Sequence, residues 1–414
     1  MNLKLRLIIM NFLEFFIWGS WLITIGNYWF QTKEWSGTEF GIIFSTMGIA
    51  SLFMPALMGI VADRWINAER LFGILHLLSG AALFYIPQIN HPVTFFWGIL
   101  VAMIFYMPTI ALANSIAYTA LENSKYDVVK DFPPIRVFGT IGFIVAMWIV
   151  NLSGNKSSAN QFYIASAVSF LLGLYAFTLP KCFPLGQTEV RKSFMERMGL
   201  DAFELFKQRK MALFFIFSMF LGAALQLTNA YGDVFLDDFK RIPEYAGSFV
   251  VKYSTIIMSI SQMSETLFIL AIPFFLKRFG IKNVMLISLF AWALRFGLFG
   301  YGNPTGGLWM IILSCIVYGM AFDFFNISGS IFVETTVAPT MRSSAQGLFM
   351  MMTNGIGAVL GSSVSGYVIQ RWFTAADGIT KDWHSIWLIF ATYALIIGIL
   401  FALLFKDKTN KIKG

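Results

Sequence analysis

The sequence predicts an all-α polytopic membrane protein with twelve transmembrane helices in two halves of six. Hydrophobic residues make up 57% of the 414 residues, charged residues only 13%, and the mean hydropathy is +0.69. A large soluble protein does not have this composition. Apolar stretches of membrane-spanning length recur along the whole chain, and one long polar stretch divides them into two sets.

Each expected span has roughly 18–25 mostly apolar residues, the length that crosses a hydrocarbon core of about 30 Å. The first six are predicted at 7–30, 40–61, 71–89, 94–120, 135–152 and 162–180. The second six are predicted at 212–236, 253–276, 284–301, 308–333, 343–370 and 384–405. No small-residue cleavage site precedes the polar residues 31–34, so the first span is interpreted as an uncleaved helix.

The distribution of basic residues predicts which ends of the spans face the cytoplasm. With both termini in the cytoplasm, 21 Lys and Arg residues fall on that side and 7 on the other. Cytoplasmic loops carry the excess of positive charge, so both termini are expected there. The net charge of +8 is then a consequence of topology, and no nucleic-acid partner is expected.

The longest polar segment divides the chain into domains. An N-terminal six-helix bundle is predicted at 1–180, a cytoplasmic linker at 181–211, and a C-terminal six-helix bundle with a short cytoplasmic tail at 212–414. The linker contains an amphipathic piece with Leu200, Phe203 and Phe206.

A weak internal repeat relates the two halves. Tyr106 and Asn114 in the fourth span recur, at an offset of 212 residues, as Tyr318 and Asn326 in the tenth. A repeat of six spans is typical of secondary transporters, whose binding site lies near the membrane midplane between the repeats.

Polar side chains inside the spans form stripes along single helix faces. Glu265 lies near the middle of the apolar run 254–272, where an ionisable group costs several kcal/mol unless it is paired or wetted. The stripes comprise Arg136, Thr140 and Phe143; Gln226, Asn229 and Asp233; Gln262 and Glu265; and Phe322, Asp323, Asn326 and Ser330. They predict a common wet cavity, although amides that bridge neighbouring helices are the alternative for individual residues.

The pattern of cysteine and histidine indicates neither a metal site nor a cofactor. Cys182 and Cys315 are far apart, and His76, His91 and His384 are scattered. A membrane enzyme would need a catalytic acid or metal cluster near a membrane surface, whereas the deepest acids here lie in mid-span. The sequence therefore favours a protein that is not an enzyme.

Several segments resemble known transporter motifs. Residues 59–64 (GIVADR) resemble the start of the G-x-x-x-D-R-x-G signature of the major facilitator superfamily, although Ile66 replaces the usual glycine. More specific are 131–140 (DFPPIRVFGT), 222–232 (GAALQLTNAYG), 259–266 (SISQMSET) and 321–329 (AFDFFNISG). These resemble the bacterial nucleoside:proton symporter family of that superfamily.

The resemblance implies the major facilitator fold and import of purine and pyrimidine nucleosides, such as uridine and adenosine, together with protons. Transport would proceed by alternating access across the bacterial inner membrane, without a cofactor. The expected partners are nucleosides, protons and the lipid bilayer, and the protein is expected to act as a monomer.

The chemistry of an uncharged nucleoside assigns roles to the stripes. Gln226, Asn229, Gln262 and Glu265 suit ribose hydroxyls and base edges, because side-chain amides both donate and accept. Phe143 or Phe322 would stack on the base. The remaining expected binding residues are Arg136, Thr140, Asp323 and Asn326. Arg136, placed just after a helix start at Pro133-Pro134, either holds the ligand or balances an acid.

Proton coupling is assigned to a carboxylate, because no histidine is expected in the cavity. Asp323 and Glu265 are the candidates; the internal repeat places Ala111 opposite Asp323, so this acid exists in one half only. Glu14 is either a second proton site or the partner of a nearby cation. Arg295 is expected to snorkel towards the membrane surface or to pair structurally.

Two alternatives keep the fold and change the function. A sugar or other neutral polyol would also bind amides, a carboxylate and aromatic rings. A sensor with the same pocket would bind the nucleoside without transporting it.

Overall fold

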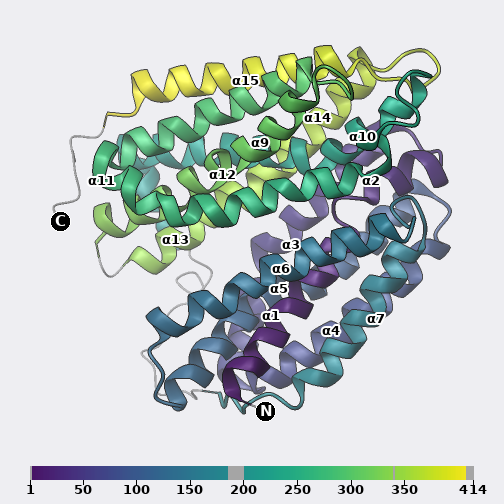
Figure 1. Ribbon diagram of the computed structural model, residues 1–414. Helices are drawn as coiled ribbons and strands as arrows, with labels where there is room; N and C mark the ends of the chain where they lie inside the picture. The colour runs from purple at the N-terminus through teal and green to yellow at the C-terminus, as the bar shows by residue number, and fades with distance from the viewer. Residues whose placement is uncertain (1, 185–199, 339–340, 407–414) are drawn as a thin grey trace. The chain divides into compact units, whose positions relative to one another are not determined.

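A computed structural model describes residues 2–184, 200–338 and 341–406 (Figure 1). The described residues form helices, and their β pairing is limited to an isolated antiparallel bridge between Thr374 and Lys381. The chain separates into two compact units. Unit 1 comprises Met1–Trp35 and Thr46–Met198, and unit 2 comprises Ser36–Ser45 and Gly199–Gly414.

Unit 1 is a bundle whose long helices lie side by side in Figure 1. Its elements are α1 (Leu3–Gly19), α2 (Ile25–Asn27), the π-helical turn Tyr28–Thr32, most of α3 (Gly37–Arg64), α4 (Ala68–Tyr85), the 3₁₀ turn Ile86–Gln88, α5 (Pro92–Asn123), α6 (Val128–Leu152) and α7 (Asn160–Ala176). Helix α1 packs against α5, α6 and α7, and α4 packs against α5 and α7.

Two glycines bring α1 and α6 together. A Cβ atom on Gly19 would lie 2.5 Å from the main-chain oxygen of Phe143, and one on Gly142 would collide with the main chain of Phe12. Small residues at such crossings let helix backbones approach closely in a membrane, where packing rather than the hydrophobic effect holds helices together. The close crossing positions the predicted stripe of α6 against α1.

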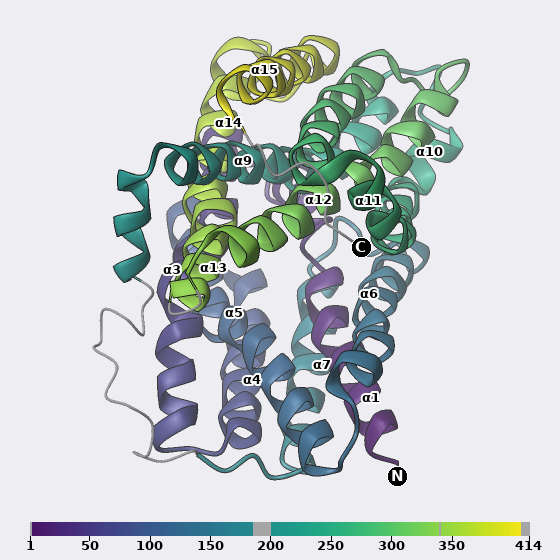
Figure 2. The ribbon, with the colours of Figure 1, turned by 90° about the vertical axis from the view of Figure 1, so that its left-hand side faces the viewer.

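Unit 2 contains the remaining helices. They are the 3₁₀ helix Leu200–Lys207, α9 (Arg209–Asp238), the 3₁₀ turn Phe239–Arg241, α10 (Phe249–Lys252), α11 (Ser254–Tyr301), α12 (Leu308–Thr336), α13 (Arg342–Met350), the π-helical segment Met351–Gly357, α14 (Ala358–Trp372) and α15 (Trp383–Leu404). Helix α11 packs against α12, α15 and α9, and α9 also packs against α14. In Figure 2, α13 continues into α14 through the π-helical segment Met351–Gly357.

The start of α3 belongs to unit 2. The main-chain N–H of Gly37 donates to Oε1 of Gln370 over 3.0 Å. A Cβ atom on Gly41 would lie 2.5 Å from the Cα atom of Gly366. This part of α3 is therefore packed backbone to backbone against α14.

The twelve predicted spans are all found as helical segments. Among the described residues, nine helices are long and apolar enough to cross a membrane. One of them, α11, contains two predicted spans, divided at Gly280, whose φ of 77° is in the left-handed region that favours glycine. The first and sixth spans are formed by α1 and α7, which have 17 residues each. The predicted fold class is confirmed.

One predicted helix start is wrong. Helix α6 begins at Val128, so Pro133 and Pro134 lie inside the helix rather than at its start. The carboxylate of Asp127 accepts a hydrogen bond from the main-chain N–H of Lys130 over 3.3 Å, as an N-cap residue does. This cap starts the helix before the prolines.

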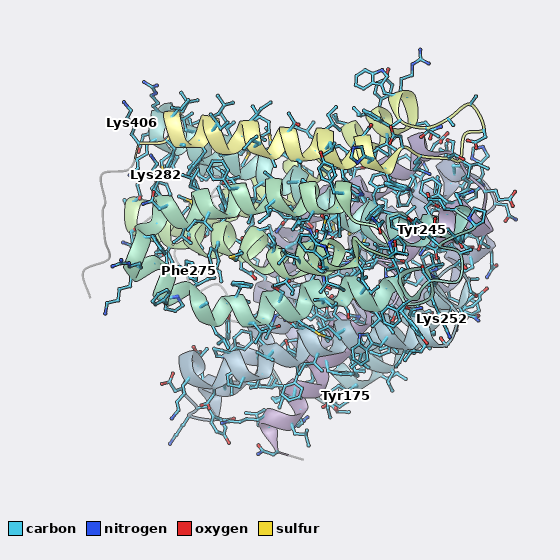
Figure 3. All side chains as sticks on the ribbon, turned by 45° about the horizontal axis from the view of Figure 1, so that its top comes forward. Tyr175, Tyr245, Lys252, Phe275, Lys282 and Lys406 are labelled. Carbon is cyan, nitrogen blue, oxygen red and sulfur yellow. The ribbon has the colours of Figure 1, made fainter. Side chains whose placement is uncertain are left out.

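Helix ends that are far apart in the sequence lie together in unit 2, as expected for antiparallel helices. Figure 3 shows Lys282 and Lys406 near one end of the unit and Tyr245 and Lys252 near the other. The ammonium of Lys282 donates to the main-chain oxygen of Ala402 over 3.3 Å. The turn within α11 and the end of α15 therefore lie together.

The predicted linker and tail are described only in part. Residues 185–199 of the linker and 407–414 of the tail lie outside the described residues. Phe203 and Phe206 lie on the short helix Leu200–Lys207 with ring centroids 5.9 Å apart, and Phe206 also contacts Phe215 of α9. The amphipathic piece is therefore attached to the start of α9.

Candidate functional site

Three helices of unit 2 present buried oxygen atoms without a hydrogen-bond partner among the described residues. These atoms are Oε1 of Gln226 on α9, Oε1 of Gln262 on α11 and Oδ2 of Asp323 on α12. Buried polar atoms are nearly always paired, and each unpaired one costs about 1–3 kcal/mol. Helix α11 packs against both α9 and α12. This part of unit 2 is therefore built to receive hydrogen-bond donors.

Two carboxyl groups lie close together in the same unit. Asp323 is only 3% exposed, and Glu265 is near enough to interact with it electrostatically. Two carboxylates in such a place repel each other, and a proton on either one removes that repulsion. The geometry suits the binding of a proton.

Tyr318 connects these acids with a buried cation. Its ring lies within electrostatic reach of Glu265 and Asp323. The guanidinium carbon of Arg295 lies 4.7 Å from the centroid of the same ring, and the ring of Phe322 stacks on it with a centroid separation of 6.1 Å. Phe322 is partly exposed, and its ring is stacked against that of Tyr318.

Of the two alternatives predicted for Arg295, the structure shows structural pairing rather than snorkelling. Arg295 is 0% exposed. Its guanidinium donates to the main-chain oxygen of Ser314 over 2.6 Å and to the hydroxyls of Thr228 and Ser261 over 3.4 Å each. Among the described residues it forms no ion pair with an acid. The cation is held by neutral groups from α9, α11 and α12.

The predicted stripe of α6 lies in unit 1, against α1. The guanidinium carbon of Arg136 lies 3.9 Å from the ring centroid of Phe15, a cation–π contact. Phe143 is 8% exposed and meets Trp18 edge-on, with ring centroids 6.4 Å apart. Thr140, one turn after Arg136, is partly exposed. The structure therefore places Arg136 and Phe143 on aromatic rings of α1.

The predicted residues thus fall into two sets. Within unit 1, Arg136 and Phe143 contact α1, and Thr140 lies between them on α6. Within unit 2, the others lie on α11 and the two helices that pack against it: Gln226 and Asn229 on α9, Gln262 and Glu265 on α11, and Phe322, Asp323 and Asn326 on α12. Asn229 and Asn326 are partly exposed.

One pair of interacting groups was not predicted from the sequence. His76, described above as one of three scattered histidines, lies with its Nε2 atom 2.7 Å from Oε2 of Glu14, and both side chains are 0% exposed. The two residues are 62 positions apart on α1 and α4. Their signal in the sequence was that each is an ionisable group inside a predicted span.

No metal site accompanies these groups within the described ranges. No group of three or more His, Cys, Asp and Glu residues there could hold a metal ion. The amides, acids and rings instead suit an uncharged ligand with hydroxyl and N–H donors and a flat face.

Comparison with protein families gives a match over residues 1–410 to the nucleoside H+ symporter family. The chain belongs to the nucleoside H+ symporter family. Nucleoside permease NupG of Escherichia coli is 53% identical over 409 residues, which cover 99% of this chain and 97% of NupG. Xanthosine permease of Escherichia coli is also 53% identical, over 98% of this chain and 96% of that protein.

A solved structure supports the fold of this family member. The crystal structure of the nucleoside transporter NupG matches with a TM-score of 0.92 at 53% identity, covering 99% of this chain and all of that one. A mutant form of NupG matches with a TM-score of 0.94. The major facilitator architecture inferred from the sequence motifs agrees with this match.

Proposed function

We propose that this protein imports purine and pyrimidine nucleosides together with protons, by alternating access, across the bacterial inner membrane. The observation that carries the proposal is the set of unpaired buried oxygens of Gln226, Gln262 and Asp323 on packed helices. A nucleoside supplies ribose O–H and base N–H donors for such acceptors. The nucleoside crosses the membrane without chemical change.

In this proposal the residues predicted from the sequence bind the substrate. Gln226, Asn229, Gln262, Glu265 and Asn326 bind its polar edges, and Phe322 or Phe143 stacks on its base for about 1–3 kcal/mol. Thr140 and Arg136 hold its other end. Asp323 or Glu265 carries the coupled proton, and their electrostatic interaction supports this role.

The arrangement of the chain in the membrane is part of the proposal. Residues 1–180 and 212–414 act as the two halves, joined by the cytoplasmic linker 181–211, with both termini in the cytoplasm. The basic loops support this orientation. A single chain supplies every binding residue, which supports a monomer as the working unit.

Uptake into proteoliposomes tests the function. Radiolabelled uridine and adenosine are supplied with and without an inward proton gradient, and a radiolabelled sugar serves as the control. We expect accumulation of the nucleosides that collapses when an uncoupler is added. Accumulation of the sugar instead would support a polyol symporter, and saturable binding of uridine without flux would support a sensor.

A further inference from the structure

A buried acid–base pair in unit 1 has no part in the function proposed so far. Oε2 of Glu14 on α1 and Nε2 of His76 on α4 are 2.7 Å apart. Both side chains are completely buried. Two groups that can each bind a proton are thus held in contact where water does not reach.

Neighbouring helices complete the hydrogen bonds of this pair. The hydroxyl of Thr109 lies 2.7 Å from the second carboxyl oxygen of Glu14, and the hydroxyl of Tyr106 donates to the main-chain oxygen of Glu14 over 2.7 Å. On the other side, the hydroxyl of Ser169 donates to the main-chain oxygen of His76 over 2.8 Å. The pair therefore joins α1, α4, α5 and α7.

These contacts determine where the protons lie. A serine hydroxyl has one hydrogen, and that of Ser169 is used on the main-chain oxygen of His76. While the hydroxyl hydrogen stays on that oxygen, the contact of 3.3 Å between Ser169 Oγ and Nδ1 of His76 uses a hydrogen on Nδ1. Nε2 and Glu14 Oε2 then share a single proton, carried either as imidazolium beside carboxylate or as neutral imidazole beside carboxylic acid.

Release of that proton would change these contacts. One H+ would pass to water and leave a carboxylate beside a neutral imidazole, whose single N–H hydrogen can serve either Glu14 through Nε2 or Ser169 through Nδ1. The pair would change from zero to one negative charge in a buried place, at a large cost in solvation. The link between α1 and α4 therefore depends on the bound proton.

Among the described residues, few other ionisable groups near Glu14 and His76 could bind the proton in their place. Tyr106 from α5 interacts electrostatically with Glu14 and with Arg136 of α6, and Arg136 stacks on Phe15, the next residue of α1. Helix α7 presents Ser169. On α4, Glu69 is bound to the side chain of Asn67 and the main-chain N–H of Cys182.

The pair is connected with the proposed substrate residues through α1. The guanidinium of Arg136 lies over the ring of Phe15, the residue next to Glu14. Trp18, one turn further on, contacts both Phe143 and Tyr106, with ring centroids 6.4 and 5.8 Å apart. A proton that fixes α1 against α4 and α5 also fixes the rings on which Arg136 and Phe143 lie.

We infer that Glu14 and His76 form a second proton-binding site, separate from Glu265 and Asp323, and that its proton is linked to nucleoside binding. The link to nucleoside binding rests on the proposed function, whereas binding of the proton does not. Two measurements separate these claims.

The first measurement is the melting temperature of the purified full-length protein in detergent as a function of pH. Glu14→Gln keeps a hydrogen bond to Nε2 through its amide N–H and needs no shared proton. Because the folded protein holds the shared proton and the unfolded chain releases it, the wild-type melting temperature should fall as the pH rises. In Glu14→Gln this part of the fall should be absent.

Two control variants exclude a general effect on stability. Thr109→Val removes the contacts of the hydroxyl with Glu14 and with the main-chain oxygen of Tyr106 but keeps the acid and the base, so its melting temperature should be lower at every pH with the wild-type dependence. His384→Gln removes a histidine of unit 2 that contacts the main-chain oxygen of Gly300, and it should also keep that dependence. Equal pH profiles for the wild type and Glu14→Gln would overturn the proton site.

The second measurement is the dissociation constant of uridine over the same pH range. Because uridine binding requires the shared proton in this proposal, wild-type affinity should fall as the pH rises, by up to tenfold per pH unit from this site. Glu265 and Asp323 are unchanged in both the wild type and Glu14→Gln. The difference in pH dependence between these two proteins is therefore due to the Glu14–His76 pair. Equal pH dependence in the two proteins would overturn the link. Absence of uridine binding at every pH would overturn the proposed function, while the melting temperatures still decide whether the pair binds a proton.

Discussion

The guanidinium of Arg295 lies on the ring of Tyr318, with 4.7 Å between its central carbon and the ring centroid. Tyr106, which the internal repeat relates to Tyr318, lies against the ring of His76 with a centroid separation of 6.2 Å. In each unit the repeated tyrosine therefore packs on a buried basic side chain and lies within electrostatic reach of a glutamate, Glu14 or Glu265. The two units use the same position to support their buried ionisable groups.

Replacement of Arg295 by lysine should destabilise unit 2. A lysine ammonium cannot reach the oxygens of Ser261 and Ser314 together while also stacking on Tyr318, because only the guanidinium is a planar fork. Loss of one hydrogen bond to the charged group predicts a cost of about 1.5–3 kcal/mol. The melting temperature in detergent measures this loss.

Arg241→Lys is the matched control for that variant. Arg241 is partly exposed, with 35% of its side chain accessible, and pairs with Asp238 over 3.1 Å. Exposed ion pairs contribute about 0–1 kcal/mol, so this variant should melt close to the wild type. Equal melting temperatures for both variants would show that the contacts of Arg295 do not stabilise the fold.

Replacement of Gly142 by alanine should separate α1 from α6. The added methyl group would meet the main chain of Phe12, which cannot move aside as a side chain can. Overpacking of this kind costs about 1–3 kcal/mol. Gly297→Ala in α11 is the control, because nothing lies within 4 Å of its added Cβ. The control should be stabilised by up to about 1 kcal/mol, as alanine favours a helix over glycine. A lower melting temperature for Gly142→Ala alone is the expected result.

The positions of the spans could be predicted from sequence because each depends only on the length of a local apolar stretch. Helix α9, for example, covers Arg209–Asp238 where 212–236 was predicted. The stripes on α9, α11 and α12 were also predicted, because residues three, four and seven apart share one helix face. Both the hydropathy of a span and the sharing of one helix face depend only on residues that are close together in the sequence.

The contacts between distant helices could not be predicted in this way. The partner of Glu14 is His76, and no periodicity within one helix reveals which residue of another helix faces it. For Arg295 the sequence left open whether the side chain snorkels or pairs structurally. Its actual partners, Thr228, Ser261 and Ser314, lie on three different spans.

Removal of the charge from the coupled acids should uncouple transport from the proton gradient. Glu265→Gln and Asp323→Asn keep the size of each side chain, so both proteins should fold. At least one of them should lose accumulation of uridine driven by an imposed pH gradient, because a neutral amide carries no transported proton. Uptake into proteoliposomes measures this, with Glu334→Gln as the control, since Glu334 is 54% exposed and pairs with Arg342. If both variants still concentrate uridine, Asp323 and Glu265 do not carry the proton.

Replacement of Gln226 or Gln262 by leucine distinguishes a binding role from a structural one. Each side chain has an oxygen without a partner among the described residues, so leucine removes an unsatisfied group rather than a hydrogen bond of the fold. The melting temperature should stay the same or rise. The KM for uridine uptake should increase by about two- to tenfold, which corresponds to the loss of one hydrogen bond of about 0.5–1.5 kcal/mol. If the glutamines instead bridge helices, leucine would lower the melting temperature and leave KM unchanged.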